Sequence, residues 1–165
     1  MNRTDVELES TVERVTPILL GVSEEAASKR PRPGAWSAKE IIGHLIDSAA
    51  NNHRRFVEAQ YRDDLVFPGY DQNAWVSAQR YQERPWRELV SLWHSYNLHL
   101  CHIIAAVPQA VREKVQNRHN LHEIAWRRLP ETESTTLEYF MADYVEHLRH
   151  HISQAFRVLG VAEAW

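Results

Sequence analysis

Four long segments with apolar residues at helical spacing constrain this chain more than any other feature. They cover approximately residues 5–20, 37–61, 85–107 and 135–160. In the last segment, one face at about 100° per residue carries Leu137, Phe140, Met141, Tyr144, Leu148, Ile152, Ala155 and Leu159. Such stripes are buried against one another, and no long segment has the two-residue period of a strand. The sequence therefore predicts an all-α four-helix bundle with one or two longer connections and short extra helices.

Proline, glycine and polar residues mark the connections between these segments. Residues 29–34 include two prolines and a glycine, which forbid a helix there. Residues 67–71 predict a turn, after which Asp71 caps a short helix that extends to residue 79. Between residues 108 and 134 the periodicity weakens. Here we expect a short helix at 109–116 and then an irregular crossing with room for an extended piece.

Two capping boxes predict where helices begin. Ser37 precedes Glu40 by three residues, and Thr135 precedes Glu138 by the same spacing. In such a box each side chain accepts a hydrogen bond from the backbone N–H of the other residue. We therefore expect the second long helix to begin at Ser37 and the last one at Thr135. Gly160 is suited to end the last helix.

Length, charge and cysteine content exclude several classes of protein. The chain has 165 residues, a formal net charge of −3 and a single cysteine, Cys101. It has no basic patch for nucleic acid, and its longest apolar runs, such as 103–107, are too short to span a bilayer. The first residues lack the apolar core of a secretory signal. We expect one cytoplasmic domain over residues 1–165 with no nucleic-acid or membrane partner.

Aromatic residues are numerous, with six Trp and six Tyr. Aromatic side chains are enriched in protein interfaces. We therefore expect a homodimer, although the same rings can instead fill the core of the bundle.

Ten histidines suggest a metal site. His147 and His151 are four residues apart on the last helix, so their imidazoles lie one turn apart and can hold one ion. Both lie at the edge of the apolar face, whereas His150 falls on the polar side and is expected to be solvated. His44 lies at the edge of the apolar face of the second helix. Together, these three residues form a candidate site with open coordination positions for water or substrate.

Other interpretations of the histidines stay open at this point. An i,i+4 pair arises by chance on many helices, and a histidine at the core edge is satisfied equally well by Asp47 or a backbone carbonyl. Three histidines of the third helix fall off its apolar stripe and are expected at the surface: His94, His99 and His102. The last two are suited to adventitious metal binding. The irregular stretch carries His119 and His122, which can approach a site from a loop.

Three motifs, taken together, resemble the DinB/YfiT-like superfamily. Residues 36–47, WSAKEIIGHLID, are similar to its W-s-x-x-E-h-h-x-H-h-h-D signature. Residues 69–76, GYDQNAWV, are similar to the acidic-aromatic short helix of the YfiT-like branch. Residues 147–154, HLRHHISQ, are similar to the closing H-x-x-H-H-x-x-Q pattern. The three motifs follow the family's order and spacing across nearly the whole chain.

The resemblance implies a four-helix bundle with one divalent ion, of the zinc or nickel type, on His44, His147 and His151 and completed by water. Family members with assigned activity are metal-dependent transferases or isomerases that use a low-molecular-weight thiol such as bacillithiol, mycothiol or glutathione. We therefore expect transfer of such a thiol cosubstrate to a small electrophile. Two alternatives stay open: a non-catalytic metal-binding stress or sensor module, and a metal-dependent hydrolase of a small ester or amide.

Supporting roles are less constrained by the sequence. Asp47 and Asp143 lie close in sequence to the candidate ligands, so either is a candidate to orient an imidazole. Cys101 is expected to be a small core residue. Residues 119–133 are rich in Arg and His, and the substrate would differ from that of the thiol transferases if this segment lines the pocket. Because protons compete for imidazole, we expect metal release on acidification from neutral pH towards about 5.

Overall fold

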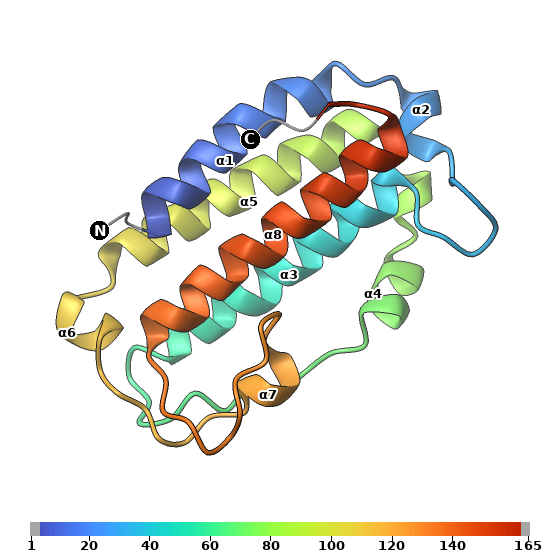
Figure 1. The fold of residues 1–165 in the computed structure, drawn as a ribbon. Helices are drawn as coiled ribbons and strands as arrows, with labels where there is room; N and C mark the ends of the chain where they lie inside the picture. The colour runs from blue at the N-terminus through green and yellow to red at the C-terminus, as the bar shows by residue number, and fades with distance from the viewer. Residues whose placement is uncertain (1–3, 163–165) are drawn as a thin grey trace.

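Four long helices pack side by side in the computed structural model, which describes residues 4–162 (Figure 1). They are α1 (Thr4–Leu20), α3 (Ala38–Glu58), α5 (Trp86–Ala106) and α8 (Leu137–Leu159). Helices α5 and α8 each pack against both α1 and α3. The consecutive long helices α1 and α3 therefore occupy opposite corners of the bundle. The all-α four-helix prediction is confirmed.

Short helices lie in the connections between the long helices. They are α2 (Glu24–Ser28), α4 (Gln72–Gln79), the 3₁₀ helix η1 (Tyr81–Glu83), α6 (Gln109–Arg112) and α7 (Leu121–Ile124). Helix α6 is therefore shorter than the predicted 109–116. None of the helices between residues 4 and 162 combines the length and apolar character that a membrane span requires.

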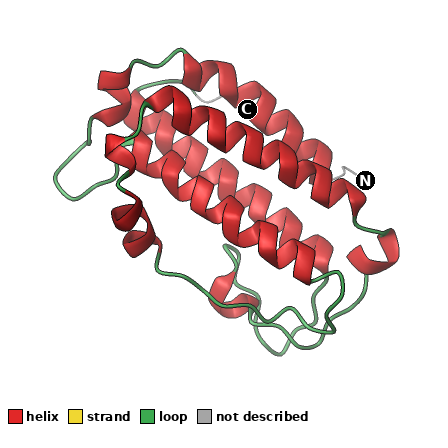
Figure 2. Cartoon of the chain, turned by 180° about the vertical axis from the view of Figure 1, so that it is seen from behind, coloured by secondary structure: helices red, strands yellow, loops and turns green. Residues whose placement is uncertain are grey.

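The connection between α3 and α4 and the connection between α6 and α8 meet at one side of the bundle, where Figure 2 shows the longest loops gathered. Leu65 pairs with His119 in an isolated parallel bridge, and Gln116 pairs with Thr135 in an antiparallel one. The expected extended piece is therefore present as these two bridges. The first bridge fixes the segment that carries α7 against the loop that follows α3, and the second closes that segment at the start of α8.

The predicted capping box at Thr135 is wrong by one residue. Thr136 is the N-cap of α8, and its hydroxyl accepts the backbone N–H three residues on at 3.1 Å. Thr135 instead exchanges backbone hydrogen bonds with Gln116, at 2.8 and 2.9 Å. Glu138 is paired with Arg112 at 2.8 Å. Because the bridge holds Thr135 in an extended conformation, the helix can begin only after it.

The first capping box and the cap of α4 are confirmed. Ser37 Oγ accepts the Glu40 N–H at 3.3 Å, and Glu40 Oε2 accepts the Ser37 N–H at 2.9 Å. Asp71 Oδ1 accepts two backbone N–H groups of the first turn of α4. Gly160, at φ 65°, ends α8 as predicted. Helix α3 ends at Glu58, three residues before the predicted end.

The 3₁₀ helix η1 approaches α3 closely at Gly43. A Cβ at Gly43 would lie 2.1 Å from Cδ2 of Tyr81, so only glycine allows this ring to rest on α3. The Tyr81 hydroxyl then donates to Asp47 Oδ1 at 2.6 Å. The helix surface that faces η1 is therefore shaped by one residue without a side chain.

Candidate metal centre

His44 on α3 and the pair His147 and His151 on α8 converge at one point of the bundle. One ligand nitrogen from each ring lies within 4.8 Å of the other two. The His44 and His147 Nε2 atoms are 3.3 Å apart, and the His151 ring centroid is 4.6 Å from each of the other two centroids. Because α3 and α8 are neighbours, the three sequence-predicted ligands lie together.

Burial keeps these imidazoles neutral. His44 is 1% exposed, and burial, helped by the positive charge that His151 can carry, lowers its pKa to about 3. Burial also lowers the pKa of His147 well below its ordinary value, and that of His151 below its own. At neutral pH all three rings therefore present lone pairs, as metal binding requires.

The side chains that form hydrogen bonds with the imidazole Nδ1 atoms are those of Gln154 and Ser48, and not those of Asp47 and Asp143. His151 Nδ1–H donates to Gln154 Oε1 at 2.8 Å, which leaves the Nε2 lone pair free. His147 Nδ1 lies 3.4 Å from the Ser48 hydroxyl. His44 Nδ1 is buried and has no hydrogen-bond partner among the described residues.

Asp47 and Asp143, the two candidates to orient an imidazole, make their described hydrogen bonds to other groups. Asp47 Oδ1 accepts hydrogen bonds from the Tyr81 hydroxyl at 2.6 Å and from Gln79 Nε2 at 2.5 Å. The Asp143 carboxylate accepts the backbone N–H groups of Trp126 at 2.8 Å and Arg127 at 2.7 Å. Neither carboxylate makes a hydrogen bond to an imidazole of the cluster among the described residues.

Two tryptophan side chains pack beside the imidazole cluster. Trp36, just before α3, lies 5.3 Å from His44 between ring centroids. Trp126, in the segment that Asp143 anchors, lies 5.7 Å from His147 and 6.1 Å from His151. The indoles limit solvent access to the cluster. Trp36 stands at the start of the motif at residues 36–47, whereas Trp126 has no spacing signal, because it comes from a connection whose path is set by tertiary contacts.

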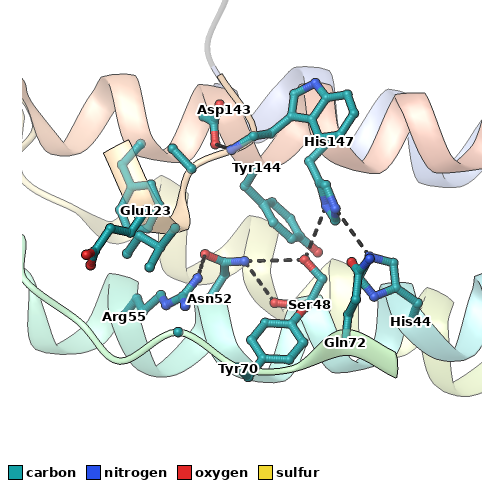
Figure 3. A pocket seen from close by; sticks show the side chains of 15 residues that line it. His44, Ser48, Asn52, Arg55, Tyr70, Gln72, Glu123, Asp143, Tyr144 and His147 are labelled. Carbon is teal, nitrogen blue, oxygen red and sulfur yellow. Dashed lines mark hydrogen bonds between the residues drawn. The ribbon is translucent and has the colours of Figure 1, made fainter. Parts of the chain in front are cut away.

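A pocket of about 240 Å³ opens beside the cluster (Figure 3). Its lining combines the imidazoles with polar residues of α3, the loop before α4 and the α7 segment. These residues are His44, Ser48, Asn52, Arg55, Gly69, Tyr70, Gln72, Glu123, Ile124, Ala125, Trp126, Phe140, Asp143, Tyr144 and His147. Within residues 119–133, those at 123–126 line the pocket, which meets the condition stated above for a substrate other than that of the thiol transferases. The volume suits a small molecule.

The polar row on α3 that follows His44 was not predicted from the sequence. Ser48, Asn52 and Arg55 succeed it at one-turn intervals, and all line the pocket. Asn52 Nδ2 donates to Ser48 Oγ at 3.4 Å, and Arg55 Nη1 donates to Asn52 Oδ1 at 3.4 Å. The signal was present in the sequence as polar residues at helical spacing on an otherwise apolar face.

Tyr70 supplies a hydroxyl to the same pocket. Burial raises its pKa to about 12, with a further contribution from the charge of Asp47, so the hydroxyl stays protonated at neutral pH. The Tyr144 hydroxyl is already committed, because it donates to Asn97 Oδ1 at 2.5 Å. Tyr70 is therefore the better-placed hydroxyl to donate to a bound molecule.

The other histidines of α5 and α8 lie outside the cluster. His150 is exposed, as expected, and its ring lies 4.3 Å from Trp126. His94 Nε2 lies 3.1 Å from a Glu13 carboxylate oxygen. His99 and His102 are exposed, and their rings stack at 6.5 Å.

The loop histidines do not reach the site. His119 is buried and holds its own loop, because its Nε2 donates to the Glu133 carbonyl at 2.7 Å and its Nδ1 accepts the Leu121 N–H. His122 lies beside Glu123 at 3.7 Å. Cys101 is a buried core residue, and burial raises the pKa of its thiol to about 12.

The residues present fit a divalent ion. Three neutral nitrogen donors suit zinc, nickel, copper or iron. A tetrahedral ion with Zn–N bonds of about 2.0–2.1 Å holds its ligand nitrogens about 3.3 Å apart, and the observed separation between His44 and His147 Nε2 is 3.3 Å. A set of three donors also leaves room for a fourth ligand.

Comparisons with known proteins identify the family of this chain. A sequence model of the DinB superfamily matches residues 7–155. A protein of Halalkalibacterium halodurans named "Putative metal-dependent hydrolase" is 20% identical over 153 residues, which are 93% of this chain and 82% of that protein. A protein of Oceanobacillus iheyensis with the same description is 26% identical over 70 residues, which are 42% of this chain and 40% of that protein.

A solved structure shares the fold. YfiT from Bacillus subtilis, described as "a probable metal-dependent hydrolase with an unusual four-helix bundle topology", superposes with a TM-score of 0.73. The match covers 96% of this chain and 87% of YfiT, at 18% sequence identity. At that identity the likeness establishes the fold alone.

Proposed function

Because this chain belongs to the DinB superfamily, and because three imidazoles converge beside its pocket, two of which line it, we propose that it is a divalent-metal-dependent hydrolase of a small molecule. The convergence of His44, His147 and His151 carries the proposal. The relatives named as metal-dependent hydrolases support the choice of reaction.

In this proposal, the side chains around the cluster have separate roles. When bound, a divalent ion lowers the pKa of a coordinated water and so supplies a nucleophile near neutral pH. Neutral imidazoles are ready to hold the ion, and Gln154 keeps the His151 ring oriented. The indoles of Trp36 and Trp126 restrict solvent around the reacting centre. Tyr70 Oη, protonated at neutral pH, donates to an oxygen of the substrate.

Transfer of a low-molecular-weight thiol is the second candidate, and the state of the carboxylates favours it. Asp47 and Asp143 are held by other donors, and Glu123 lies at the opposite end of the pocket from His44 in Figure 3. No carboxylate of residues 4–162 makes a described hydrogen bond to an imidazole of the cluster. A thiol needs less help, because its ordinary pKa of about 8.5 already lies close to neutrality.

Turnover by the zinc- or nickel-loaded protein distinguishes the two reactions. We expect hydrolysis of chromogenic small esters or amides without any thiol, lost on chelation and in His151→Ala but retained in His150→Ala. If turnover instead requires bacillithiol, mycothiol or glutathione and consumes the thiol with an electrophile, thiol transfer is the function. Tight metal binding without either reaction would contradict both and favour a sensor.

A further inference from the structure

Arg55 is a buried cation without an anionic partner. Its side chain lies on the α3 face that carries His44, and the residue is 5% exposed. Its guanidinium donates to the Pro68 carbonyl at 2.8 Å and to Asn52 Oδ1 at 3.4 Å, and both acceptors are neutral. No carboxylate within residues 4–162 forms an ion pair with it. Figure 3 shows the guanidinium directed towards Asn52 at the pocket wall.

A charge in this position is costly unless something compensates it. Buried charges in proteins are normally paired with an opposite charge and fully hydrogen-bonded, because removing an ion from water carries a penalty of several kcal/mol. A guanidinium has five N–H donors, and the two acceptors named above use only part of them. Arg55 lines the pocket, so a bound molecule can reach the remaining donors.

We propose that Arg55 forms a subsite for a carboxylate group of the small-molecule substrate. This inference rests on the proposed function, because it concerns the same pocket. Guanidinium groups bind carboxylates through paired N–H donors. Arg55 is the one arginine or lysine among the residues that line the pocket. The lining also holds the carboxylates of Glu123 and Asp143, so a monoanionic carboxylate is accommodated more readily beside Arg55 than a phosphate dianion.

The position of Arg55 defines where that carboxylate lies in the substrate. Arg55 follows His44 by eleven residues, so about 16 Å of helix separates their Cα atoms at a rise of 1.5 Å per residue. Figure 3 shows the two side chains towards opposite ends of the pocket, with Ser48, Asn52 and Tyr70 between them. The substrate class is therefore a small ester or amide with its carboxylate several bonds from the one that breaks.

Direct binding to metal-free protein tests the subsite apart from catalysis. The probes are 4-phenylbutyrate and its neutral amide, which have nearly the same shape, and calorimetry measures the affinities. We expect the carboxylate to bind at least tenfold more tightly than the amide. Arg55→Gln, which can still donate to Pro68, should abolish this preference. Arg55→Lys, which keeps the charge, should retain part of it.

Arg54→Gln is the matched control, because Arg54 is its exposed neighbour and pairs with Glu58. It should keep the full preference, as should His151→Ala, whose metal site is impaired. A preference that survives Arg55→Gln overturns the proposal, even if that variant melts earlier, since Arg55 would then only hold the loop at Pro68. Equal affinity for both probes, or no saturable carboxylate binding in the millimolar range, also overturns it. If esters are not hydrolysed but the preference holds, the proposed function alone fails.

Discussion

His151 and Gln154 lie three residues apart on α8, and the imidazole Nδ1–H donates to the amide oxygen over 2.8 Å. This bond determines which ring nitrogen carries the proton, so that Nε2 of His151 keeps its lone pair. Hydrogen bonds of this kind orient metal-ligating histidines and make them more basic. Gln154 is therefore part of the candidate metal centre although it is not a ligand.

Replacing Gln154 by Ala should weaken metal binding without unfolding the bundle. Loss of the partner frees the His151 ring to rotate and to change tautomer, and we expect affinity to fall by about 10- to 100-fold. Competition with a chelating dye measures the change. Ser153→Ala, one residue earlier on α8, is the control, and equal losses in both variants would contradict the orienting role.

Elemental analysis tests the ligand set directly. His151→Ala should lose nearly all bound zinc or nickel, because two imidazoles hold an ion far less tightly than three. His150→Ala should retain it, since this exposed ring packs against Trp126. Comparable metal loss in the two variants would show that the assignment of His151 is wrong.

Acid should destabilise the metal-free protein, and His44 accounts for part of the effect. Its pKa is about 3 in the folded protein and near 6.5 in an unfolded chain. Between these values the unfolded chain binds more protons, so stability present above pH 6.5 is lost on acidification, by at most about 1.4 kcal/mol per pH unit for this group. Urea unfolding of metal-free protein between neutral pH and pH 5 measures it. A midpoint independent of pH would refute this.

The same low pKa values change the expectation for metal release. Free imidazole protonates near pH 6.5, but burial opposes protonation of His44, His147 and His151 in the folded chain. We therefore expect metal to be released at a lower pH than free imidazole would indicate. Bound metal followed during acid titration, beside circular dichroism, tests this. Complete release above pH 6 with helices intact would contradict it.

Asp143→Ala should loosen the segment that carries Trp126. The carboxylate accepts the backbone N–H groups of Trp126 and Arg127, and no other described acceptor replaces it. We expect a loss of about 1–3 kcal/mol in the free energy of unfolding. Acrylamide should also quench tryptophan fluorescence more strongly in the variant. Glu146→Ala, which removes a half-exposed carboxylate from the same helix and an ion pair with Arg127, is the control and should have a small effect on both.

Gly43→Ala should destabilise the fold through Tyr81. The new Cβ would lie 2.1 Å from the ring, so Tyr81 must move and its hydrogen bond to Asp47 is lost. We expect a net cost of about 1–3 kcal/mol, although alanine favours a helix. Gly69→Ala is the control, since its Cβ would meet Ile124 at an ordinary 3.7 Å. Unchanged stability in Gly43→Ala would show that the ring moves freely.

Helical periodicity in the sequence was enough to predict the four-helix architecture, because the spacing of apolar residues at a period of 3.6 is a local property of the chain. The same periodicity placed His147 and His151 on one face of the last helix and His150 on its polar side. The cap at Ser37 was also local, since a capping box needs only four residues. Thr135 was misassigned because its backbone pairs with Gln116, a partner from a distant segment.

The groups that surround the imidazoles could be identified only from the fold. Asp47 and Asp143 lie near the ligands in sequence, yet η1 and the segment after α7 engage their carboxylates. Trp126 reaches the cluster because that segment crosses α8, which no local pattern encodes. That Arg55 has no anionic partner among the described residues likewise became evident only in the fold. Whether a buried charge has a partner depends on contacts between residues far apart in the chain, and helical periodicity carries no information about them.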